Sequence, residues 1–246
     1  GIADDPDSAY RYTAKGNLVA VISDGSAILG LGNLGPMASK PVMEGKALLF
    51  KRFAGIDSID IEVNAESPQA FIETVSRIAD TFGAITLAVL KAPESSEIER
   101  VLIEQCNIPV FHDDQHGTAI IVTAAFTNWM KLTGRDIKKT RLVASGAGAS
   151  AIACLRLLVN AGLPKENIIV TDRNGVIYKG RNEGMDPYKE EFANDTDKRE
   201  LSDALEDAHV FLGLSGPGVM NKDLVAKMAK APLIMALANP TPEIMP

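Results

Sequence analysis

Short runs of apolar residues alternate with stretches of helical periodicity along the whole chain. The apolar runs predict strands over residues 17–23, 28–31, 59–63, 85–90, 109–111, 142–145, 168–172, 210–214 and 233–237. Apolar residues at helical spacing predict helices over 36–53, 68–82, 95–106, 118–132, 148–161, 200–207 and 221–230. Because strands and helices alternate, the pattern predicts an α/β fold whose parallel strands are joined by right-handed crossovers.

This alternation falls into two series. The basic connector GRDIKKTR at 134–141 precedes a fresh set of elements that begins with the strand over 142–145. We place the domain boundary before the long helix over 118–132, which predicts an N-terminal α/β domain over residues 1–115 and a second domain over residues 116–246. The second series is typical of a Rossmann-like domain, in which helices cover both faces of a doubly wound parallel sheet.

Two glycine-rich loops have the spacing of the turn that binds a dinucleotide pyrophosphate. The loop GAGASA follows an apolar strand and opens a helix, whose N–H groups and dipole suit a phosphate. The loop GLGNLG at 30–35 matches the motif more closely. The strand after GAGASA ends in Asp172, whose carboxylate can accept both ribose hydroxyls. The strand after GLGNLG does not end in an acidic residue. We therefore predict that the dinucleotide binds at Gly146, Ala147, Gly148, Ala149, Ser150 and Ala151.

The choice between NAD and NADP stays open in the sequence. Asp172 favours the free 2′-hydroxyl of NAD, whereas the adjacent Arg173 can pair with the 2′-phosphate of NADP. At the end of the same domain, Asn239 follows the strand over 233–237, where an amide can bridge cofactor and substrate. An ordinary Asn-Pro turn is the alternative for Asn239.

Lys46 is set among apolar residues. Its helical neighbours three and four positions away are Val42, Met43, Leu49 and Phe50, so its amine is expected to project toward the apolar face. Partial burial disfavours an ammonium group, which is how a lysine becomes a usable base near neutral pH. The alternative is a lysine whose tip returns to water.

The segment HDDQH lies between a strand and a helix. Its adjacent carboxylates, Asp113 and Asp114, suit a hard divalent cation such as Mg²⁺ or Mn²⁺. A helix N-cap with favourable acids in the first turn explains the same residues equally well. His112 and His116 are four residues apart, but a zinc site needs a third ligand.

The composition and charge of the chain limit the kinds of molecule that it is expected to bind. The 246 residues include 32 acidic and 25 basic side chains, for a formal charge of −7, and Lys and Arg are scattered along the chain. This balance argues against a nucleic acid or an anionic membrane and is compatible with a small charged ligand. The two cysteines and the lack of an apolar run of about 18 residues predict a reducing, cytoplasmic setting. The start at Gly1 suggests a processed or partial chain.

Several blocks, in the same order, resemble the malic enzymes of the bacterial type. They are RYTAKGNLVAV, ILGLGNLGP, PVMEGKALLFKRFAGID, IPVFHDDQHGTAI, ASGAGASAIA, VTDRNGVIYKGR and ALANPTPEI, and together they cover essentially the whole chain. The resemblance implies oxidative decarboxylation of L-malate to pyruvate and CO₂, with NAD or NADP as hydride acceptor and Mg²⁺ or Mn²⁺ as metal. It also implies a homo-oligomer, at least a dimer.

The same resemblance gives each candidate residue a role. Lys46 would be the general base that takes the C2 hydroxyl proton of malate. Asp113 would orient this lysine and contribute to the metal site, and Asp114 matches a metal ligand. The loop that begins at Gly146 matches the dinucleotide site, and Asn239 matches a ligand contact. A different dehydrogenase would leave the helix of Lys46 and the HDDQH block unexplained.

One departure from the family pattern raises an alternative function. The family carries a Glu-Asp pair before K-A-P, and Ala88 and Val89 stand at those positions here. The loss of two of the three expected carboxylates removes negative charge that would balance the cation. The alternative is therefore a malic-enzyme-like protein that binds a dinucleotide and a dicarboxylate but is impaired in decarboxylation.

Overall fold

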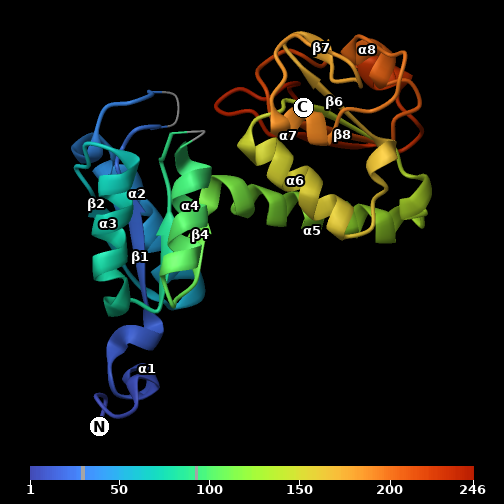
Figure 1. The fold of residues 1–246 in the computed structure, drawn as a ribbon. Helices are drawn as coiled ribbons and strands as arrows, with labels where there is room; N and C mark the ends of the chain where they lie inside the picture. The colour runs from blue at the N-terminus through green and yellow to red at the C-terminus, as the bar shows by residue number, and fades with distance from the viewer. Residues whose placement is uncertain (29–30, 92–93) are drawn as a thin grey trace. The chain divides into compact units, whose positions relative to one another are not determined.

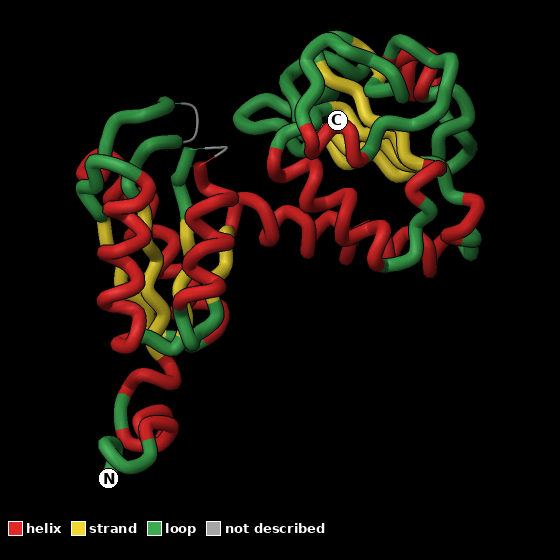
Figure 2. The backbone as a smooth tube through the Cα atoms, in the orientation of Figure 1, coloured by secondary structure: helices red, strands yellow, loops and turns green. Residues whose placement is uncertain are grey.

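The computed structural model describes residues 1–28, 31–91 and 94–246. Over these residues the chain divides into two compact units, Gly1–Asp114 and Gln115–Pro246. Each unit builds helices around a sheet whose strands are mainly parallel (Figures 1 and 2). The predicted α/β class is confirmed.

The sheet of the first unit is parallel, with the strand order β2-β1-β3-β4. Its strands are β1 (Leu18–Ser23), β2 (Asp57–Glu62), β3 (Ala84–Leu87) and β4 (Val110–His112). The register pairs Leu87 of β3 with His112 of β4. The segments that begin at residues 88 and 113 therefore leave the sheet side by side at its carboxyl edge.

Helices cover both faces of this first sheet. They are α2 (Pro36–Leu49), α3 (Pro68–Ile78) and α4 (Glu94–Gln105), with a short α1 (Ala9–Tyr12) before β1. Because side chains alternate along a strand, Ala20 and Ile22 of β1 pack with α3 and α4. Val21 points to the other face and packs with Met43 of α2. Figure 1 shows α3 and α4 running side by side on their face of the sheet.

The sheet of the second unit has the strand order β7-β6-β5-β8-β9. Its strands are β5 (Leu142–Ser145), β6 (Ile168–Asp172), β7 (Gly175–Val176), β8 (Val210–Gly213) and β9 (Leu233–Ala236), with β7 antiparallel to β6 and the other pairs parallel. The chain moves from β5 outward to β6 and β7, then returns to β8 on the other side of β5. Such a reversal is the switch point at which doubly wound sheets bind ligands beyond the carboxyl ends of their strands.

Two apolar layers hold the second unit together. Its helices are α5 (Thr118–Thr133), α6 (Ala149–Asn160), α7 (Pro187–Glu191), α8 (Leu201–Ala204) and α9 (Lys222–Lys227). On one face, Leu142 of β5 packs with Phe126 of α5 and Leu155 of α6. On the other face, Val143 of β5 packs in a cluster that includes Met228. The strands are therefore buried on both sides, as their continuous apolar runs predicted.

Some predicted elements differ from the structure. The strand predicted over residues 28–31 lies partly outside the described residues, and Ile28 forms an isolated bridge with Gly32. The polar segment over 173–198, for which no element was predicted, contains β7 and α7. There Gly175, at φ +90°, permits a tight return of the chain after β6. A two-residue strand is too short for its period to be read from sequence.

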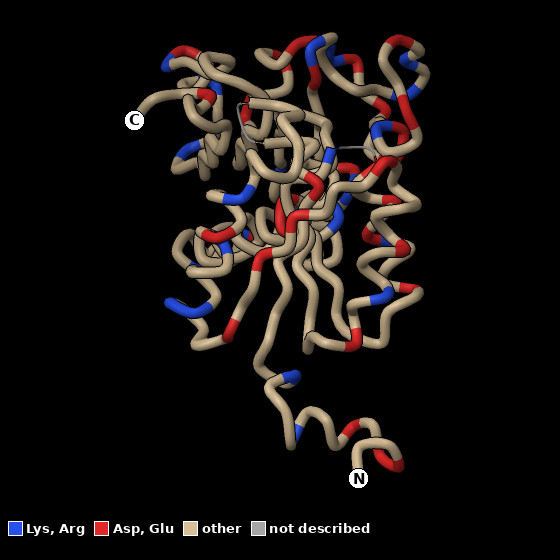
Figure 3. The backbone as a smooth tube through the Cα atoms, turned by 90° about the vertical axis from the view of Figure 1, so that its left-hand side faces the viewer, with Lys and Arg blue, Asp and Glu red and all other residues tan. Residues whose placement is uncertain are grey.

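Charged residues of both signs are distributed along the backbone of both units. Lys and Arg are interspersed with Asp and Glu over helices and loops, as the sequence indicated (Figure 3). None of the helices described in residues 1–28, 31–91 and 94–246 has the length and apolar character needed to cross a membrane.

Candidate functional site

Lys46 and Asp113, which lie on different elements of the first unit, form an ion pair. Lys46 is in the last turns of α2, and Asp113 follows β4 directly. The Lys46 Nζ donates a hydrogen bond to Asp113 Oδ2. The lysine side chain is 24% exposed and the aspartate side chain 40% exposed. The pair is therefore accessible to a ligand at the carboxyl edge of the sheet.

The helical neighbours of Lys46 explain only part of its position. Met43 is fully buried, but Val42 and Leu49 are exposed. Lys46 thus lies at the border of the apolar cluster around Met43 and does not project into it. What holds the amine is its ion pair with Asp113, a residue 67 positions away in sequence.

A buried carboxylate that the sequence analysis missed anchors the strand end before Asp113. Glu99 of α4 is buried, and its Oε1 accepts the backbone N–H of His112 at 2.8 Å. Because His112 immediately precedes Asp113, this bond fixes the point from which the Asp113 side chain leaves the sheet. The burial of Glu99 could have been predicted from its position between the apolar residues Ile98 and Leu102 of an amphipathic helix.

The described residues do not fit a protein-held divalent cation. Within residues 1–28, 31–91 and 94–246, no group of three or more His, Cys, Asp and Glu side chains gathers to hold a metal. Asp114 is exposed at the surface, and Asp113 is already paired with Lys46. Mg²⁺ requires a near-ideal set of oxygen ligands, of which two adjacent carboxylates can supply only part.

Apolar side chains occupy the carboxyl edge next to Asp113. Ala88 and Val89, which follow β3, are buried in the cluster that includes Val21 and Met43. The backbone of Val89 is left-handed, with φ +58°. Asp and Asn tolerate this conformation, whereas a β-branched residue is strained in it. The backbone at residue 89 therefore suits an aspartate better than the valine that it carries.

In the second unit, the GAGASA loop joins β5 to α6 in a tight turn. β5 ends at Ser145 and α6 begins at Ala149, with Gly148 as its N-cap residue. Gly146 has φ +111°, and a Cβ there would lie 2.4 Å from the carbonyl oxygen of Leu214, so glycine is required. A Cβ on Gly148 would meet no described atom within 4 Å. The N-terminus of α6 is therefore approachable by a phosphate.

The remaining residues of the predicted loop differ in burial. Ala151 is buried in α6, and Ala147 packs against the core of the second unit. Ser150, in the first turn of α6, is half-buried. Their small side chains keep the turn close to the sheet, as the motif requires.

The described residues of the rival loop GLGNLG, 31–35, lie farther from the strand that precedes them. β1 ends at Ser23 and α2 begins at Pro36, so the whole segment over 24–35 separates this strand from its helix. Gly30, the first glycine of the motif, lies outside the described residues. That a dinucleotide binds at the loop after β5 stays a prediction.

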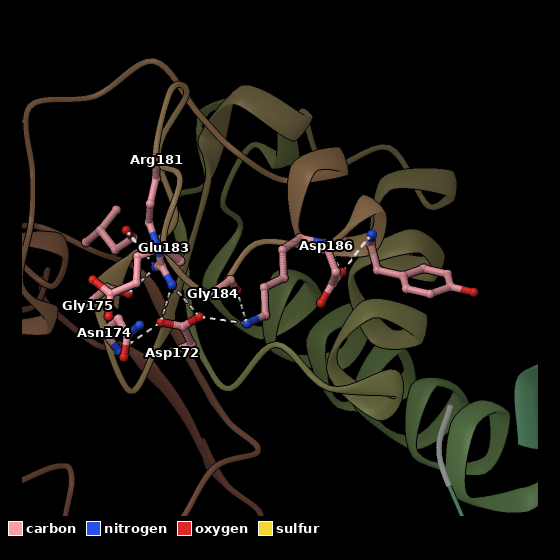
Figure 4. A network of polar contacts seen from close by, with 10 residues as sticks. Asp172, Asn174, Gly175, Arg181, Glu183, Gly184 and Asp186 are labelled. Atoms are coloured by element: carbon pink, nitrogen blue, oxygen red, sulfur yellow. Dashed lines mark hydrogen bonds and ion pairs between the residues drawn. The ribbon is translucent and has the colours of Figure 1, made fainter. Parts of the chain in front are cut away.

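Asp172 ends β6, as predicted, and is the centre of a polar network (Figure 4). Arg181 donates from Nη2 to both carboxylate oxygens, at 2.8 and 2.7 Å, and Lys189 Nζ donates to Oδ2 at 2.9 Å. The backbone N–H of Asn174 donates to Oδ1 at 2.9 Å. The carboxylate predicted to accept ribose hydroxyls is therefore already shared between two cations.

This network fastens the polar segment after β6. The Arg181 side chain, 4% exposed, also donates to the backbone carbonyls of Glu183 and Val176, at 2.9 and 3.1 Å. Burial raises the pKa of Asp172, but the hydrogen bonds from Arg181 and Lys189 outweigh burial and hold this pKa below its ordinary value. Asp172 is therefore ionised and bound within the unit.

Two further predicted residues lie at the same edge of the second sheet. Arg173, directly after β6, is exposed beside the network of Asp172. Asn239, shortly after β9, is exposed and precedes Pro240 across a cis peptide bond. Sequence reasoning missed Glu243, four residues further on, which is fully buried. Nothing in the spacing of the NPTPEI block indicated that burial.

Taken together, these features define an α/β protein with a dinucleotide-binding domain of the doubly wound type. The family model for the malic enzyme N-terminal domain matches residues 6–70, and the model for the malic enzyme NAD-binding domain matches residues 115–245. The chain belongs to the malic enzyme family.

Relatives with this similarity occur in several bacteria. The chain is 63% identical over 245 residues to an NADP-dependent malic enzyme of Halomonas elongata, and 58% identical over 245 residues to an NAD-dependent malic enzyme of Rhizobium meliloti. All of the chain is matched in both, but it spans 58% and 32% of those proteins. The crystal structure of the NAD-dependent malic enzyme from Thermotoga maritima matches with a TM-score of 0.93 and 41% identity, covering all of this chain and 66% of that one.

Proposed function

We propose that the chain acts in the NAD(P)-dependent oxidative decarboxylation of L-malate to pyruvate and CO₂. The observation that carries this proposal is the Lys46–Asp113 ion pair, which offers an accessible amine beside a carboxylate at the carboxyl edge of a parallel sheet. The tight glycine loop after β5 and the family membership support a dinucleotide as the hydride acceptor.

In this reaction, the Lys46 ammonium first releases a proton to solvent, and the resulting amine takes the proton of the C2 hydroxyl while a hydride leaves C2 for the nicotinamide ring. The ammonium that forms is stabilised by the carboxylate of Asp113, which also holds Nζ in place. As CO₂ leaves the resulting keto acid, the electrons of the broken carbon-carbon bond move toward the C2 oxygen. The Lys46 ammonium can return its proton to that oxygen, which gives the enol of pyruvate. A proton from solvent at C3, with return of the enol proton to the Lys46 amine, then gives pyruvate.

The charges around Asp172 bear on the choice of dinucleotide. Arg181 and Lys189 already neutralise this carboxylate, so its ability to attract the ribose hydroxyls of NAD is reduced. Arg173 is exposed next to it and can pair with a 2′-phosphate. This arrangement favours NADP, and the relatives include both NADP-dependent and NAD-dependent enzymes.

The test of the proposed reaction is formation of NAD(P)H and pyruvate from L-malate, with Mn²⁺ supplied. Lys46→Met is expected to lower turnover by at least about a hundredfold, the usual contribution of a positioned base. Lys51→Met is the matched control, because Lys51 follows α2 and forms an exposed ion pair with Asp57. Loss of turnover in both variants, or in neither, contradicts the role of Lys46.

A second candidate function rests on Ala88 and Val89. Their buried, apolar side chains occupy the edge beside Asp113 where the resemblance expects two acids. On this observation, the chain would bind the dinucleotide and a dicarboxylate without promoting decarboxylation, because too few oxygen ligands remain to hold a cation.

Calorimetry separates the two candidates. Mn²⁺ is titrated, with NAD(P)⁺ and a non-reactive malate analogue present, into the chain and into its Ala88→Glu/Val89→Asp variant. Binding by the variant alone favours the second candidate, because it shows that the missing acids prevent metal binding. Equal binding by both proteins favours the full reaction, with Asp113, Asp114 and substrate oxygens as sufficient ligands.

A further inference from the structure

Glu243 is a buried carboxylate that has no part in the proposed reaction so far. It lies after β9 and is 0% exposed. Its Oε1 accepts the backbone N–H of Ser215 at 2.8 Å and the Ser215 hydroxyl at 3.4 Å, and its Oε2 accepts the backbone N–H of Ala238 at 3.0 Å. These partners are neutral donors, so burial of this carboxylate depends on the hydrogen bonds that they make.

The two backbone donors lie just beyond the end of the parallel ladder. The N–H of Leu214 donates to the last residue of β5 at 2.8 Å, and the N–H of Leu237 donates to the last residue of β8 at 2.9 Å. Ser215 follows Leu214, and Ala238 follows Leu237. The N–H groups of Ser215 and Ala238 donate to the Glu243 carboxylate and not to a neighbouring strand. The carboxylate thus extends the ladder by one step and joins the segments after β8 and β9.

The space for this carboxylate depends on a glycine. A Cβ on Gly213, the last residue of β8, would lie 2.5 Å from the carboxyl carbon of Glu243 and 2.6 Å from its Oε2. The backbone of Glu243 also takes part, because its carbonyl accepts the N–H of Met220 at 3.1 Å. A buried polar group whose bonds are all made specifies one backbone geometry.

With the dinucleotide binding proposed above, the segments that Glu243 joins would lie on the nicotinamide side of the sheet. A dinucleotide crosses the carboxyl edge at the switch point, so an adenosine half over β6 leaves the other half over β8 and β9. Asn239, the candidate ligand contact, directly follows Ala238. The hydroxyl of Ser215 also lies 2.8 Å from the hydroxyl of Ser145, the residue before the glycine loop.

We propose that Glu243 is a positioning residue for the nicotinamide half of the dinucleotide. It acts through Ala238 and Ser215, by fixing the backbone that presents Asn239 and the loop after β8. A carboxylate is required because the amide of a glutamine would turn an NH₂ group toward a backbone N–H. This inference rests on the dinucleotide binding proposed above.

The experiment measures the affinity of the chain for the whole dinucleotide and for its adenosine half by calorimetry. The probes are NAD⁺ with ADP, and NADP⁺ with 2′-phospho-ADP. Glu243→Gln is expected to weaken dinucleotide binding roughly tenfold, because a buried donor loses its acceptor. Affinity for the adenosine half is expected to stay unchanged. Ile168→Val, at the opposite end of β6, removes one buried methyl group as a control and should change neither affinity.

Gly213→Ala is a second variant, because the added Cβ displaces the carboxylate without removing it, and the same selective loss is expected. Unchanged dinucleotide affinity in both variants overturns the positioning role. An equal loss for both probes overturns it as well, since it indicates a general structural defect. If the unaltered chain binds neither probe, the proposed dinucleotide binding fails together with the inference.

Discussion

The carboxyl edges of the two sheets hold their acidic side chains in opposite ways. In the second unit, Asp172 is 11% exposed and Glu243 is fully buried, and each is bound by several donors of the same unit. In the first unit, Asp113 is 40% exposed and bonds to the flexible side chain of Lys46. All three acids lie at or beyond the carboxyl ends of parallel strands, so position at the edge alone does not separate them.

These acids differ in how far their carboxylates are buried and in how many hydrogen bonds the carboxylates accept. A carboxylate with all its acceptors occupied stabilises the local backbone and has little capacity left for a ligand. A half-exposed carboxylate beside a lysine can rearrange around a substrate, and it contributes little to stability because water screens the pair. We therefore expect substitution of Asp172 to lower the stability of the second unit and substitution of Asp113 to lower turnover.

The largest effect is expected for Asp172→Asn. This change leaves the buried Arg181 guanidinium without its counter-charge and should lower the free energy of unfolding of the second unit by about 3 kcal/mol at pH 7. Urea unfolding followed by the fluorescence of Trp129 measures it, because this tryptophan is buried in α5 of the same unit. Glu191→Gln, which breaks a more exposed pair with Arg156, should cost at most about 1 kcal/mol.

The effect of Asp172→Asn should depend on pH. The folded-state pKa of Asp172 lies below its ordinary value of 3.8, so the stabilisation is fully present above that value. It is lost as the pH falls through the lower folded-state pKa. The difference between the two proteins should thus be constant from pH 7 to about pH 5 and shrink in stronger acid. A difference that grows in acid would contradict this assignment.

The next effect is expected for Asp113→Asn in the first unit. Loss of the carboxylate removes stabilisation of the Lys46 ammonium in the transition state, and kcat should fall about a hundredfold. Thermal unfolding should change little, because the pair is partly exposed to water, which screens it. Asp57→Asn breaks the exposed pair with Lys51 and serves as the control with normal kcat. A stability loss at Asp113 as large as that at Asp172 would remove the distinction between the two edges.

The smallest effect is expected for Arg173→Ala. Removal of this exposed cation beside Asp172 should lower affinity for NADP⁺ about fivefold relative to NAD⁺. This is the loss expected when one solvent-exposed, charge-assisted hydrogen bond to the 2′-phosphate is removed. Lys179→Ala, an exposed change in the same unit, should leave the ratio unaltered. Titrations with each dinucleotide measure this ratio. Equal weakening of NAD⁺ and NADP⁺ binding would show that Arg173 attracts both dinucleotides by its charge and does not recognise the 2′-phosphate.

The local pattern of the sequence determined the elements and the candidate residues. Strands followed from short apolar runs and helices from a period of 3.6 residues, which each segment carries by itself. The glycine loop after β5 and the acid at the end of β6 followed from short spacings within one strand-turn-helix unit. Lys46 stood out because of its apolar neighbours on one helix, and Asp113 because of its place after a strand.

The tertiary structure decided the partners of these residues. Lys46 meets Asp113 across 67 positions because α2 and the end of β4 belong to the same α/β layer structure. Asp172 is bound by Arg181 and Lys189 because a polar segment without periodicity folds back over β6. Glu243 reaches the end of β8 because that strand ends in a glycine. Such contacts depend on which segments become neighbours in space, and neither spacing nor period encodes that information.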